Sequence, residues 1–329
     1  MMKNHNISED EEEIQVMSEV HLGCSPFQCE AHISNYTFFQ PSGSNNSTGV
    51  DLFQPSNNPP NINKIAVDND GDLIIQRRRD SSLPRSIFTV TIKHVILSSI
   101  ANVGLQVWKA ELLLADFILH KMVTSREFEN IISLELGAGT GLAGMLLAHT
   151  ASRVYLTDFG DQILRNCDGN VELNANVLKY RNPVRVKEFD WFGSWPPKTS
   201  FEKQRYTWTE FEIEEAENCS VLLAGDVIYS DELTCALFDA LQKLMSRGTN
   251  KILYLALEKR YNFSVDELKI VANGYSHFRS FLSMEDDDGS QSKTCFVGER
   301  IDLSEVPQYC AYERGKDLEM WKISCNRNR

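Results

Sequence analysis

The sequence lacks any long hydrophobic run. Hydrophobic residues make up 42% of its 329 residues, but no apolar stretch reaches the roughly 18 residues needed to cross a bilayer. The first residues, MMKNHNISEDEEE, also lack the apolar core of a signal peptide. We therefore expect a protein of the nucleus, the cytoplasm or both, neither secreted nor bound to a membrane.

Positive charge is scarce as well. The chain has 33 Lys and Arg against 46 Asp and Glu, a formal net charge of -13. Because the phosphates of nucleic acids attract a positive surface, this balance argues against direct nucleic-acid binding and favours basic protein partners.

The cysteines and histidines lack the spacing of metal or nucleophilic sites. The eight cysteines form no CxxC pair and have no companion histidines at ligand spacing, so we expect reduced thiols and no metal ion. None of the seven histidines falls in a recognisable frame with a nucleophilic serine or cysteine. Covalent hydrolase chemistry is therefore not indicated.

What the sequence does contain is a glycine-rich loop between a strand pattern and a helix pattern. The run Leu134 to Gly144 reads LELGAGTGLAG. Its apolar start suits a buried parallel strand, and Gly137, Gly139 and Gly141 let the backbone turn sharply and approach a ligand without a Cβ in the way. The run predicts a loop that holds a nucleotide-like cofactor.

Two cofactors fit these glycines, because they can be aligned either as GxGxG or as the GxGxxG of a dinucleotide site. Glu135, just before the glycines, favours S-adenosylmethionine, since a carboxylate repels a pyrophosphate but attracts an ammonium and a sulfonium. Asp158, about 20 residues past the loop, is placed to hold ribose hydroxyls in either kind of site.

Beyond the loop, strand and helix patterns alternate. Strands are expected at Ile131–Leu136, Val154–Asp158, Val184–Phe189, Val221–Gly225, Ile252–Leu257, Phe278–Met284 and Met320–Cys325. Helices are expected at Val107–His120, Leu142–His149, Gln162–Leu178, Asp231–Met245 and Val265–Asn273. The alternation predicts an α/β fold, a Rossmann-like sheet of seven strands with helices on both faces.

The N-terminal part has a different composition. Prolines, acids and small polar residues dominate the first residues, so we expect a mostly disordered tail, with some apolar character at Val16–Phe27 that can dock on the main domain. Strands at Leu73–Ile75 and Ile87–Leu97 predict a small antiparallel lead-in. The expected division is a tail over 1–62, a β-rich lead-in packed on the catalytic domain over 63–104, and that domain over 105–329.

The motif residues fall at the ends of separate predicted strands. Glu135 to Gly141, Asp158, Asp190 with Trp191, and Asp226 to Tyr229 each lie at or just past a strand end. Because ligands of parallel sheets bind outside the carboxyl ends of the strands, we expect these residues to converge on one crevice.

At this point the sequence resembles the seven-strand protein lysine methyltransferases grouped as family 16. LELGAGTGL resembles the first motif of that family, the Asp190–Trp191 pair its DW element, and DVIY from Asp226 to Tyr229 its acid-x-x-aromatic signature. The helix GLQVWKAELLLADFIL, the later EKRYNF and the final WKI extend the resemblance, which covers roughly residues 85 to 325.

The resemblance implies a cofactor site for S-adenosylmethionine. It assigns Gly137, Ala138 and Gly139 to the loop under the cofactor and Asp158 to the ribose hydroxyls. Glu135 and Asp190 belong to the same set. Three further residues complete it, namely Trp191 at the adenine, Trp108 near the methionine end and Gly225, where the family often has alanine, as a backbone contact.

The resemblance also implies that Asp226 and Tyr229 face the incoming lysine as catalytic residues. Two structural alternatives stay open. Asp226 can instead cap the helix expected to begin near Asp231, and Glu258 to Arg260 can either line the substrate groove or form a local ion-pair cluster. The acidic insert 192–220 can read a basic substrate or be a solvated loop.

We therefore expect a monomeric S-adenosylmethionine-dependent protein-lysine N-methyltransferase. The resemblance implies a nuclear protein substrate that itself binds nucleic acid, with a Kin-type zinc-finger protein as the candidate, and chaperones are further candidate partners. The glycine pattern leaves a nicotinamide-dependent oxidoreductase open, and a noncatalytic binding module with a methyltransferase fold is the other alternative.

Overall fold

The computed structural model describes residues 14–21, 31–39, 86–176, 184–199, 205–264, 269–284 and 294–327. The expected strand Leu73–Ile75 lies outside the described residues. Within the described ranges, no helix has the length and apolar character needed to cross a membrane. The same ranges contain no group of three His, Cys, Asp or Glu residues that could hold a metal ion.

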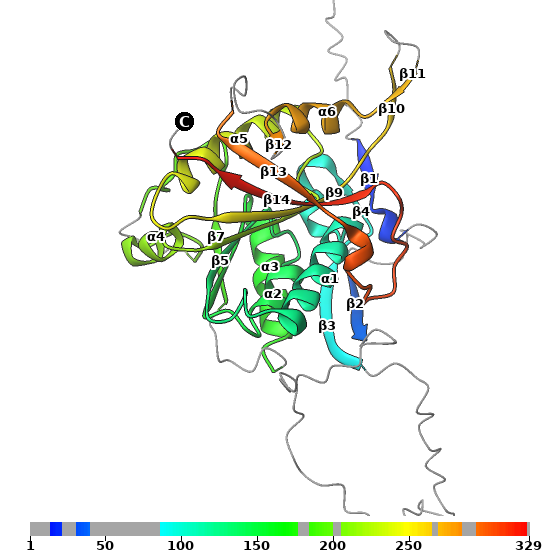
Figure 1. The fold of residues 1–329 in the computed structure, drawn as a ribbon. Coiled ribbons are helices and arrows are strands. Elements are labelled where there is room, and N and C mark those ends of the chain that lie inside the picture. Colours follow the sequence, from blue (N-terminus) through cyan, green and yellow to red (C-terminus); the bar gives the residue numbers. More distant parts are fainter. Residues whose placement is uncertain are drawn as a thin grey trace, which may run out of the picture.

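A mixed sheet forms the centre of the molecule (Figure 1). Its order is β12–β13–β14–β9–β8–β5–β6–β7, with β5 Ile132–Leu136, β6 Arg153–Asp158, β7 Val184–Glu188, β8 Val221–Gly225, β9 Ile252–Glu258, β12 Ser283–Met284, β13 Phe296–Ile301 and β14 Leu318–Cys325. Strands β5 to β9 are parallel, and β14 is antiparallel to both β9 and β13. The seven-strand Rossmann-like sheet is confirmed, and the two-residue β12 adds to its edge.

Helices cover both faces of this sheet (Figure 1). The helices are α1 Lys109–Thr124, α2 Leu142–Leu147, α3 Asp161–Leu173, α4 Glu210–Glu217, α5 Asp231–Met245 and α6 Asn273–Ser280, and the 3-10 turns are η1 Glu19–His21, η2 Ile100–Leu105 and η3 Leu303–Glu305. Helices α1 to α3 contribute to one hydrophobic core and α4 to α6 to the other. Because side chains alternate along a strand, β6 supplies Val154 and Leu156 to the first core and Tyr155 to the second.

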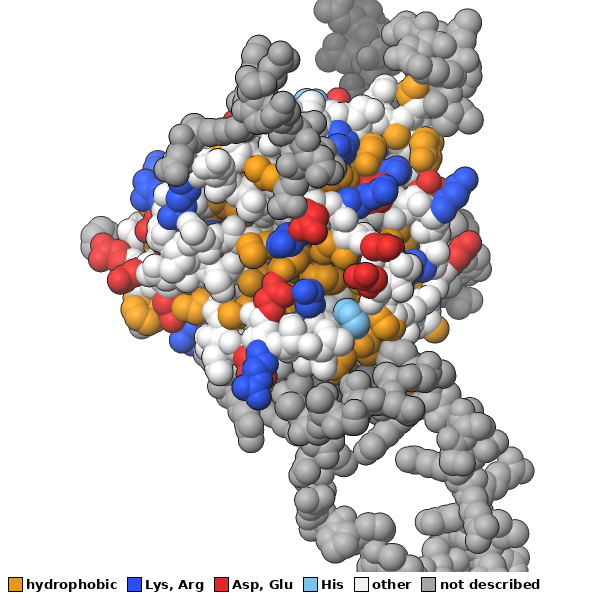
Figure 2. All heavy atoms as spheres, in the orientation of Figure 1, with side chains coloured by type: hydrophobic (Ala, Val, Ile, Leu, Met, Phe, Trp, Pro, Cys, Tyr) orange, Lys and Arg blue, Asp and Glu red, His pale blue; other side chains and the backbone are white. Residues whose placement is uncertain are grey.

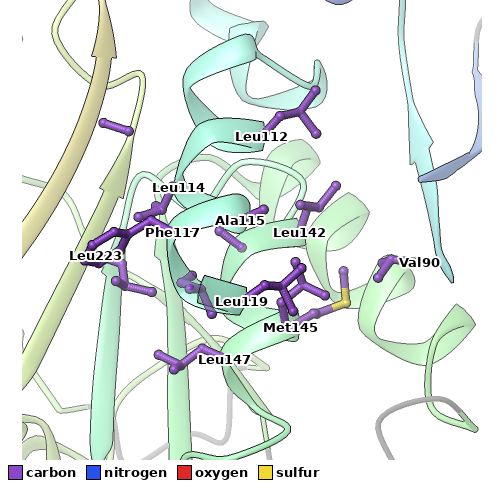
Figure 3. Close-up of a cluster of buried hydrophobic side chains, with 14 of the residues drawn as sticks. Val90, Leu112, Leu114, Ala115, Phe117, Leu119, Leu142, Met145, Leu147 and Leu223 are labelled. Carbon is purple, nitrogen blue, oxygen red and sulfur yellow. The ribbon is translucent and has the colours of Figure 1, made fainter. Parts of the chain in front are cut away.

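Helix α1 is enclosed by other elements, which explains its broad apolar face. Its residues from Ala110 to Leu119 are all buried. In Figure 3, Phe117 lies beside Leu223 of β8, and Leu142 and Met145 of α2 lie on the other side of α1. A helix with apolar residues all round is expected where the sheet and a second helix enclose it.

The expected strand Ile87–Leu97 is confirmed in the antiparallel lead-in, where it pairs with an N-terminal strand that the sequence did not predict. β1 Gln15–Met17 pairs with β4 Leu97–Ser99, and β2 His32–Phe39 pairs with β3 Ser86–His94, both antiparallel. β3 is held against α3 because its backbone N–H groups at Thr91 and Lys93 donate to Asn174 and Asn170, at 2.8 and 2.7 Å. The expected domain boundaries themselves stay a prediction.

Two elements near the C-terminus were predicted wrongly. The expected helix Val265–Asn273 contains instead the strand β11 Lys269–Val271, which pairs with β10 Asn262–Ser264. The expected strand Phe278–Met284 begins as helix α6, because Tyr275, Phe278 and Phe281 follow a helical spacing toward the aromatic cluster around Phe238. The sheet contains instead the strand β13, which pairs with β14 and had not been predicted.

The acidic insert 192–220 is not simply a solvated loop. Trp195 and Trp208 are 4% and 2% exposed, and both belong to the second core. The centres of their rings are 5.5 Å apart. Helix α4 begins with a capping box in which Thr209 and Glu212 exchange side-chain and backbone hydrogen bonds. The insert therefore adds buried structure to the sheet.

Charged side chains are mixed over the face drawn in Figure 2, where red and blue groups alternate around a central apolar area. A protein that follows a nucleic-acid backbone presents a continuous positive surface instead. In the part of this face that the structure describes, the positive side chains form no continuous surface.

A buried carboxylate joins helix α1 to the loop before β14. Asp116 is 0% exposed, and it accepts hydrogen bonds from the Tyr309 backbone N–H at 2.7 Å, the Tyr312 hydroxyl at 2.8 Å and Arg314 at 2.6 Å. These donors offset the free-energy cost of burying a carboxylate, and removing the carboxylate leaves the partly buried Arg314 without its counter-ion.

We predict that Asp116→Ala lowers the free energy of unfolding by roughly 3–5 kcal/mol, the range for breaking one side of a buried ion pair. Urea unfolding measures the change. The control is Lys322→Ala, whose ion pair with Glu299 is 41% and 47% exposed, so its cost stays within about 1 kcal/mol. Equal effects of the two substitutions would contradict the structural role of Asp116.

The glycine loop after β5 lies directly against η2. Gly139 has a φ of +52°, and a Cβ there would lie 3.0 Å from the Gly104 carbonyl oxygen. A side chain at this position would therefore suffer both a left-handed backbone and a contact with a fixed backbone atom. The close approach of these two segments requires glycine.

We predict that Gly139→Ala destabilises the fold by roughly 1–3 kcal/mol. The matched control is Gly169→Ala in α3, where an added Cβ meets nothing within 4 Å. That change should stabilise the helix by roughly 0.5–1 kcal/mol. Thermal unfolding of the two variants should shift in opposite directions, and a neutral Gly139→Ala would contradict the packing against Gly104.

Candidate active site

The motif residues come together at the carboxyl ends of adjacent strands. Glu135, Asp158 and Gly225 lie at the ends of β5, β6 and β8, and Asp190 with Trp191 directly follows β7. β5 lies between β6 and β8, so the connections that follow β5 and β8 start at neighbouring positions and diverge. This is the topological switch point where open parallel sheets bind ligands.

Asp158 connects β6 to the glycine loop. Its Oδ2 accepts from the Gly139 backbone N–H at 2.8 Å and its Oδ1 from the Phe159 N–H at 2.7 Å. Burial raises the pKa of Asp158 to about 6, although both hydrogen bonds oppose the rise. The loop is also held by Ala138, whose N–H donates to the Thr157 carbonyl at 2.9 Å.

Glu135 lies beneath the loop. It is 2% exposed, and its Oε2 accepts from the Gly144 N–H at 2.9 Å, so its carboxylate holds the start of α2. Burial raises its pKa well above the usual value, and the Glu111 carboxylate adds to the rise. The structure thus gives Glu135 a structural contact, while its predicted contribution to cofactor binding stays a prediction.

Glu111 of α1 is a site residue that the sequence analysis missed. Its Oε1 accepts from the Thr140 hydroxyl at 2.8 Å and from the Leu142 N–H at 3.2 Å. Burial raises its pKa to about 7, with these hydrogen bonds opposing. The available signal was an acid among the apolar residues of α1, which holds the two buried carboxylates Glu111 and Asp116, since a buried acid usually has a specific partner.

Trp191 lies against the glycine loop, where a Cβ on Gly137 would be 3.4 Å from its ring. Asp190 shapes the turn that carries this ring, because its Oδ1 accepts from the Phe192 N–H at 3.0 Å and its carbonyl accepts from Gly193 at 3.0 Å. The pair therefore places a flat aromatic surface next to the loop, with Asp190 acting through the turn.

Asp226 adopts a backbone conformation that is rare for a residue with a side chain. Its φ is +58°, and its N–H donates to the Ala256 carbonyl at 2.9 Å. Such strained residues gather at functional sites. Asp226 does not cap α5, because Ser230 is the N-cap and its Oγ accepts from Leu233; the capping alternative is therefore wrong.

Gly225 precedes this acid for a steric reason. A Cβ on Gly225 would lie 3.2 Å from the Glu111 Cα, tighter than most contacts of this kind. Helix α1 and the end of β8 are therefore in close backbone contact. Gly225 accommodates that contact, and its predicted backbone contact with a cofactor stays a prediction.

Aromatic side chains lie around Asp226. Trp108, the N-cap of α1, donates from Nε1 to the Val103 carbonyl at 3.0 Å, which fixes its ring. Tyr229 is 42% exposed, and burial together with the Asp158 and Asp226 carboxylates raises its pKa to about 12. Tyr229 therefore keeps its proton at neutral pH, close to both acids.

The charged residues at and just past the end of β9 have separate partners. Glu258 Oε1 lies 4.0 Å from Lys109 Nζ, and Lys259 pairs with Glu319 at 2.7 Å. Arg260 donates to both oxygens of Asp226, at 2.9 and 2.6 Å. These residues form ion pairs, as one alternative held, and through Arg260 they also reach the predicted catalytic acid.

Several known proteins are similar to this chain in sequence. Methyltransferase-like protein 22 of Mus musculus is 38% identical over 266 residues, 79% of this chain and 64% of that protein. Its Homo sapiens counterpart is 38% identical over 71% of this chain and 57% of that protein. Protein-lysine N-methyltransferase EFM6 of Saccharomyces cerevisiae is 29% identical over 48% of this chain and 64% of that protein.

The chain thus spans about three fifths of the length of the first two relatives. A sequence model of the family described as lysine methyltransferase matches residues 90–272, more than half of the chain and all four strand ends of the site. The match decides between the two cofactors that the glycine pattern had left open. The chain belongs to this lysine methyltransferase family, and S-adenosylmethionine is its cofactor.

Proposed function

We propose that the chain is a protein-lysine N-methyltransferase whose Asp226 holds the substrate amine. The observation that carries the proposal is the position of Asp226. This residue follows β8, its backbone is strained, and its carboxylate side chain is 1% exposed. It lies close to Tyr229, which is also close to the Asp158 carboxylate at the end of β6. The similarity to EFM6, itself a protein-lysine N-methyltransferase by name, supports the same activity.

The residues at the strand ends fit the cofactor. The Asp158 carboxylate can accept hydrogen bonds from ribose hydroxyls, and the Trp191 ring against Gly137 offers a flat face for adenine. Trp108 has a fixed ring next to the Asp226 ion pair, which suits a cationic group. When bound, S-adenosylmethionine supplies an electrophilic methyl group on a sulfonium.

The protein then has two tasks, to orient the amine and to free its lone pair. A lysine ammonium is attracted by the Asp226 carboxylate and loses its proton more easily where Trp108 and Trp191 exclude water. The Tyr229 hydroxyl stays protonated and presents an oxygen to the amine. Asp226 and Tyr229 would hold the neutral amine for attack on that methyl group, and the proton lost by the ammonium would leave to solvent.

The predicted substrate is a nuclear protein that itself binds nucleic acid, and a Kin-type zinc-finger protein is the candidate. The acidic composition supports a basic protein as substrate, because opposite net charges accelerate encounter. This candidate comes from the resemblance, and the chain's own residues do not select it.

The test follows labelled methyl transfer from S-adenosylmethionine to a recombinant Kin-type protein and to a nuclear extract, with mass spectrometry of the product. Asp226→Asn should lower transfer by about 100-fold or more, the usual loss when a positioned acid is removed. The control is Asp231→Asn, which neutralises an exposed acid in the first turn of α5 and should keep full activity.

Binding of S-adenosylhomocysteine by Asp226→Asn shows that the variant is folded. Label on a lysine that disappears in Asp226→Asn supports the proposal. Label on RNA, or cofactor binding without transfer to any protein, would contradict it; the latter result would favour the noncatalytic binding module.

Cofactor binding should also depend on pH through Asp158. Because its pKa is about 6, the carboxylate is ionised at pH 7.5 and protonated at pH 5. Protonation removes an acceptor for ribose hydroxyls, so the affinity for S-adenosylhomocysteine should fall as the pH drops through 6, by at most about tenfold per pH unit. Calorimetric titration between pH 5 and 8 measures it.

The variant Asp158→Asn provides the control for this pH dependence. It should bind more weakly at every pH and lose the change near pH 6, since an amide does not titrate. A pH dependence that survives in Asp158→Asn would assign the titration to another group, such as Glu135, and contradict the prediction.

A further inference from the structure

Arg260 is paired with the Asp226 carboxylate, which the proposed function assigns to binding of the substrate amine. Its two terminal nitrogens donate to Asp226 Oδ1 and Oδ2 at 2.9 and 2.6 Å, a bidentate pair. The Asp226 side chain is 1% exposed, whereas that of Arg260 is 32% exposed. The guanidinium therefore lies between the acid and the solvent side.

The same guanidinium also contacts the aromatic ring of Trp108 at the site. It lies over the Trp108 ring, 5.2 Å from the ring centre. A carboxylate and the face of a tryptophan are the two features that attract a cation here. A lysine ammonium entering the site needs both, so Arg260 and the substrate cannot hold them together.

A second set of acceptors for Arg260 lies close by. Glu19 Oε2 and Glu258 Oε2 are buried and have no hydrogen-bond partner in the described part of the chain. Both carboxylates act on Arg260: burial lowers its pKa, but Asp226, Glu19 and Glu258 together raise it above the usual value. A buried carboxylate oxygen without a donor is unfavourable, so these two oxygens are suited to receive a guanidinium.

Glu19 reaches this position because the N-terminal segment docks beside Trp108. The Ser18 N–H donates to Gln106 Oε1 at 2.7 Å, and the Ser18 hydroxyl donates to the Val107 carbonyl. Pairing of β1 with β4 fixes the same segment from the other side. The segment therefore brings an acid from the start of the chain to the residues that follow β9.

We propose that Arg260 is a resident cation of the amine site, and that the substrate ammonium displaces it from Asp226 onto the free oxygens of Glu19 and Glu258. The proposal rests on the proposed function, since it concerns the same carboxylate. Arg260 is then a positioning residue: its guanidinium pairs with the buried Asp226 carboxylate until an amine arrives. Glu19 and Glu258 lower the cost of exchanging one cation for the other.

Displacement has a measurable consequence for affinity. A ligand whose site is open in only a fraction of molecules binds more weakly by that fraction. Removing the resident cation should therefore strengthen amine binding, and removing its second acceptor should weaken it. A purely structural ion pair predicts neither change, because loss of its arginine would only destabilise the fold.

The test uses n-butylammonium chloride, which matches the end of a lysine side chain, and the full chain with S-adenosylhomocysteine present. Binding is followed by NMR through the indole N–H of Trp108 in protein labelled with ¹⁵N-tryptophan. Arg260→Met should bind n-butylammonium about tenfold more tightly or better. Arg260→Lys, which keeps a cation, should stay near the native affinity.

Glu19→Gln tests the second half of the exchange without touching the ion pair. It should weaken n-butylammonium binding in the native background and have no effect in Arg260→Met, where nothing needs to be displaced. The matched control is Arg279→Met, because Arg279 also lies over a tryptophan, 4.6 Å from the centre of the Trp321 ring. This control should leave the affinity unchanged.

Equal n-butylammonium affinity in native protein and Arg260→Met would overturn the proposal. So would tighter binding that persists in the double variant Arg260→Met, Asp226→Asn, because the amine would then bind elsewhere. n-Butanol, which has no charge, should not bind in any variant. Methyl transfer that fails while cation exchange is observed would contradict the proposed function alone, and active transfer with no exchange would contradict the displacement alone.

Discussion

The contact between helix α1 and the ends of β5 and β8 is the constraint on which the site depends. Glu111 of α1 accepts hydrogen bonds from Thr140 and Leu142 just past the glycine loop, and its backbone lies so close to Gly225 that a Cβ there would make an unusually tight contact of 3.2 Å. A buried carboxylate tolerates this position only because the loop supplies donors. The loop, the helix and the strand end therefore hold one another in place.

From this constraint the arrangement of charge follows. The sheet order brings the ends of four parallel strands together, and each end carries an acid or a residue that an acid positions. Asp158 is tied to the loop, while Asp226 is balanced by Arg260. So many carboxylates in a buried place repel one another, which suits a site that binds a cationic cofactor and a cationic amine.

The sequence predicted the parts of this site that depend on local pattern. The glycine loop, the parallel strands and the acids at their ends follow from spacing along the chain, and their positions were confirmed. Contacts between distant segments leave no such pattern, so the partners of Glu111, the approach of Glu19 and the pairing of Arg260 with Asp226 could not be predicted. β13 was missed because its FVGERI sequence has a glycine and charges where a strand signal needs apolar alternation, and α6 was mistaken for a strand because its aromatics are dense.

The most direct test of the account is a crystal structure of the full chain with S-adenosylhomocysteine. The account predicts the ribose on the Asp158 carboxylate, the adenine against Trp191 and the sulfur end directed toward Asp226. A ligand bound away from the ends of β5, β6 and β8, or an Asp226 carboxylate shielded from the sulfur by the fold, would contradict it.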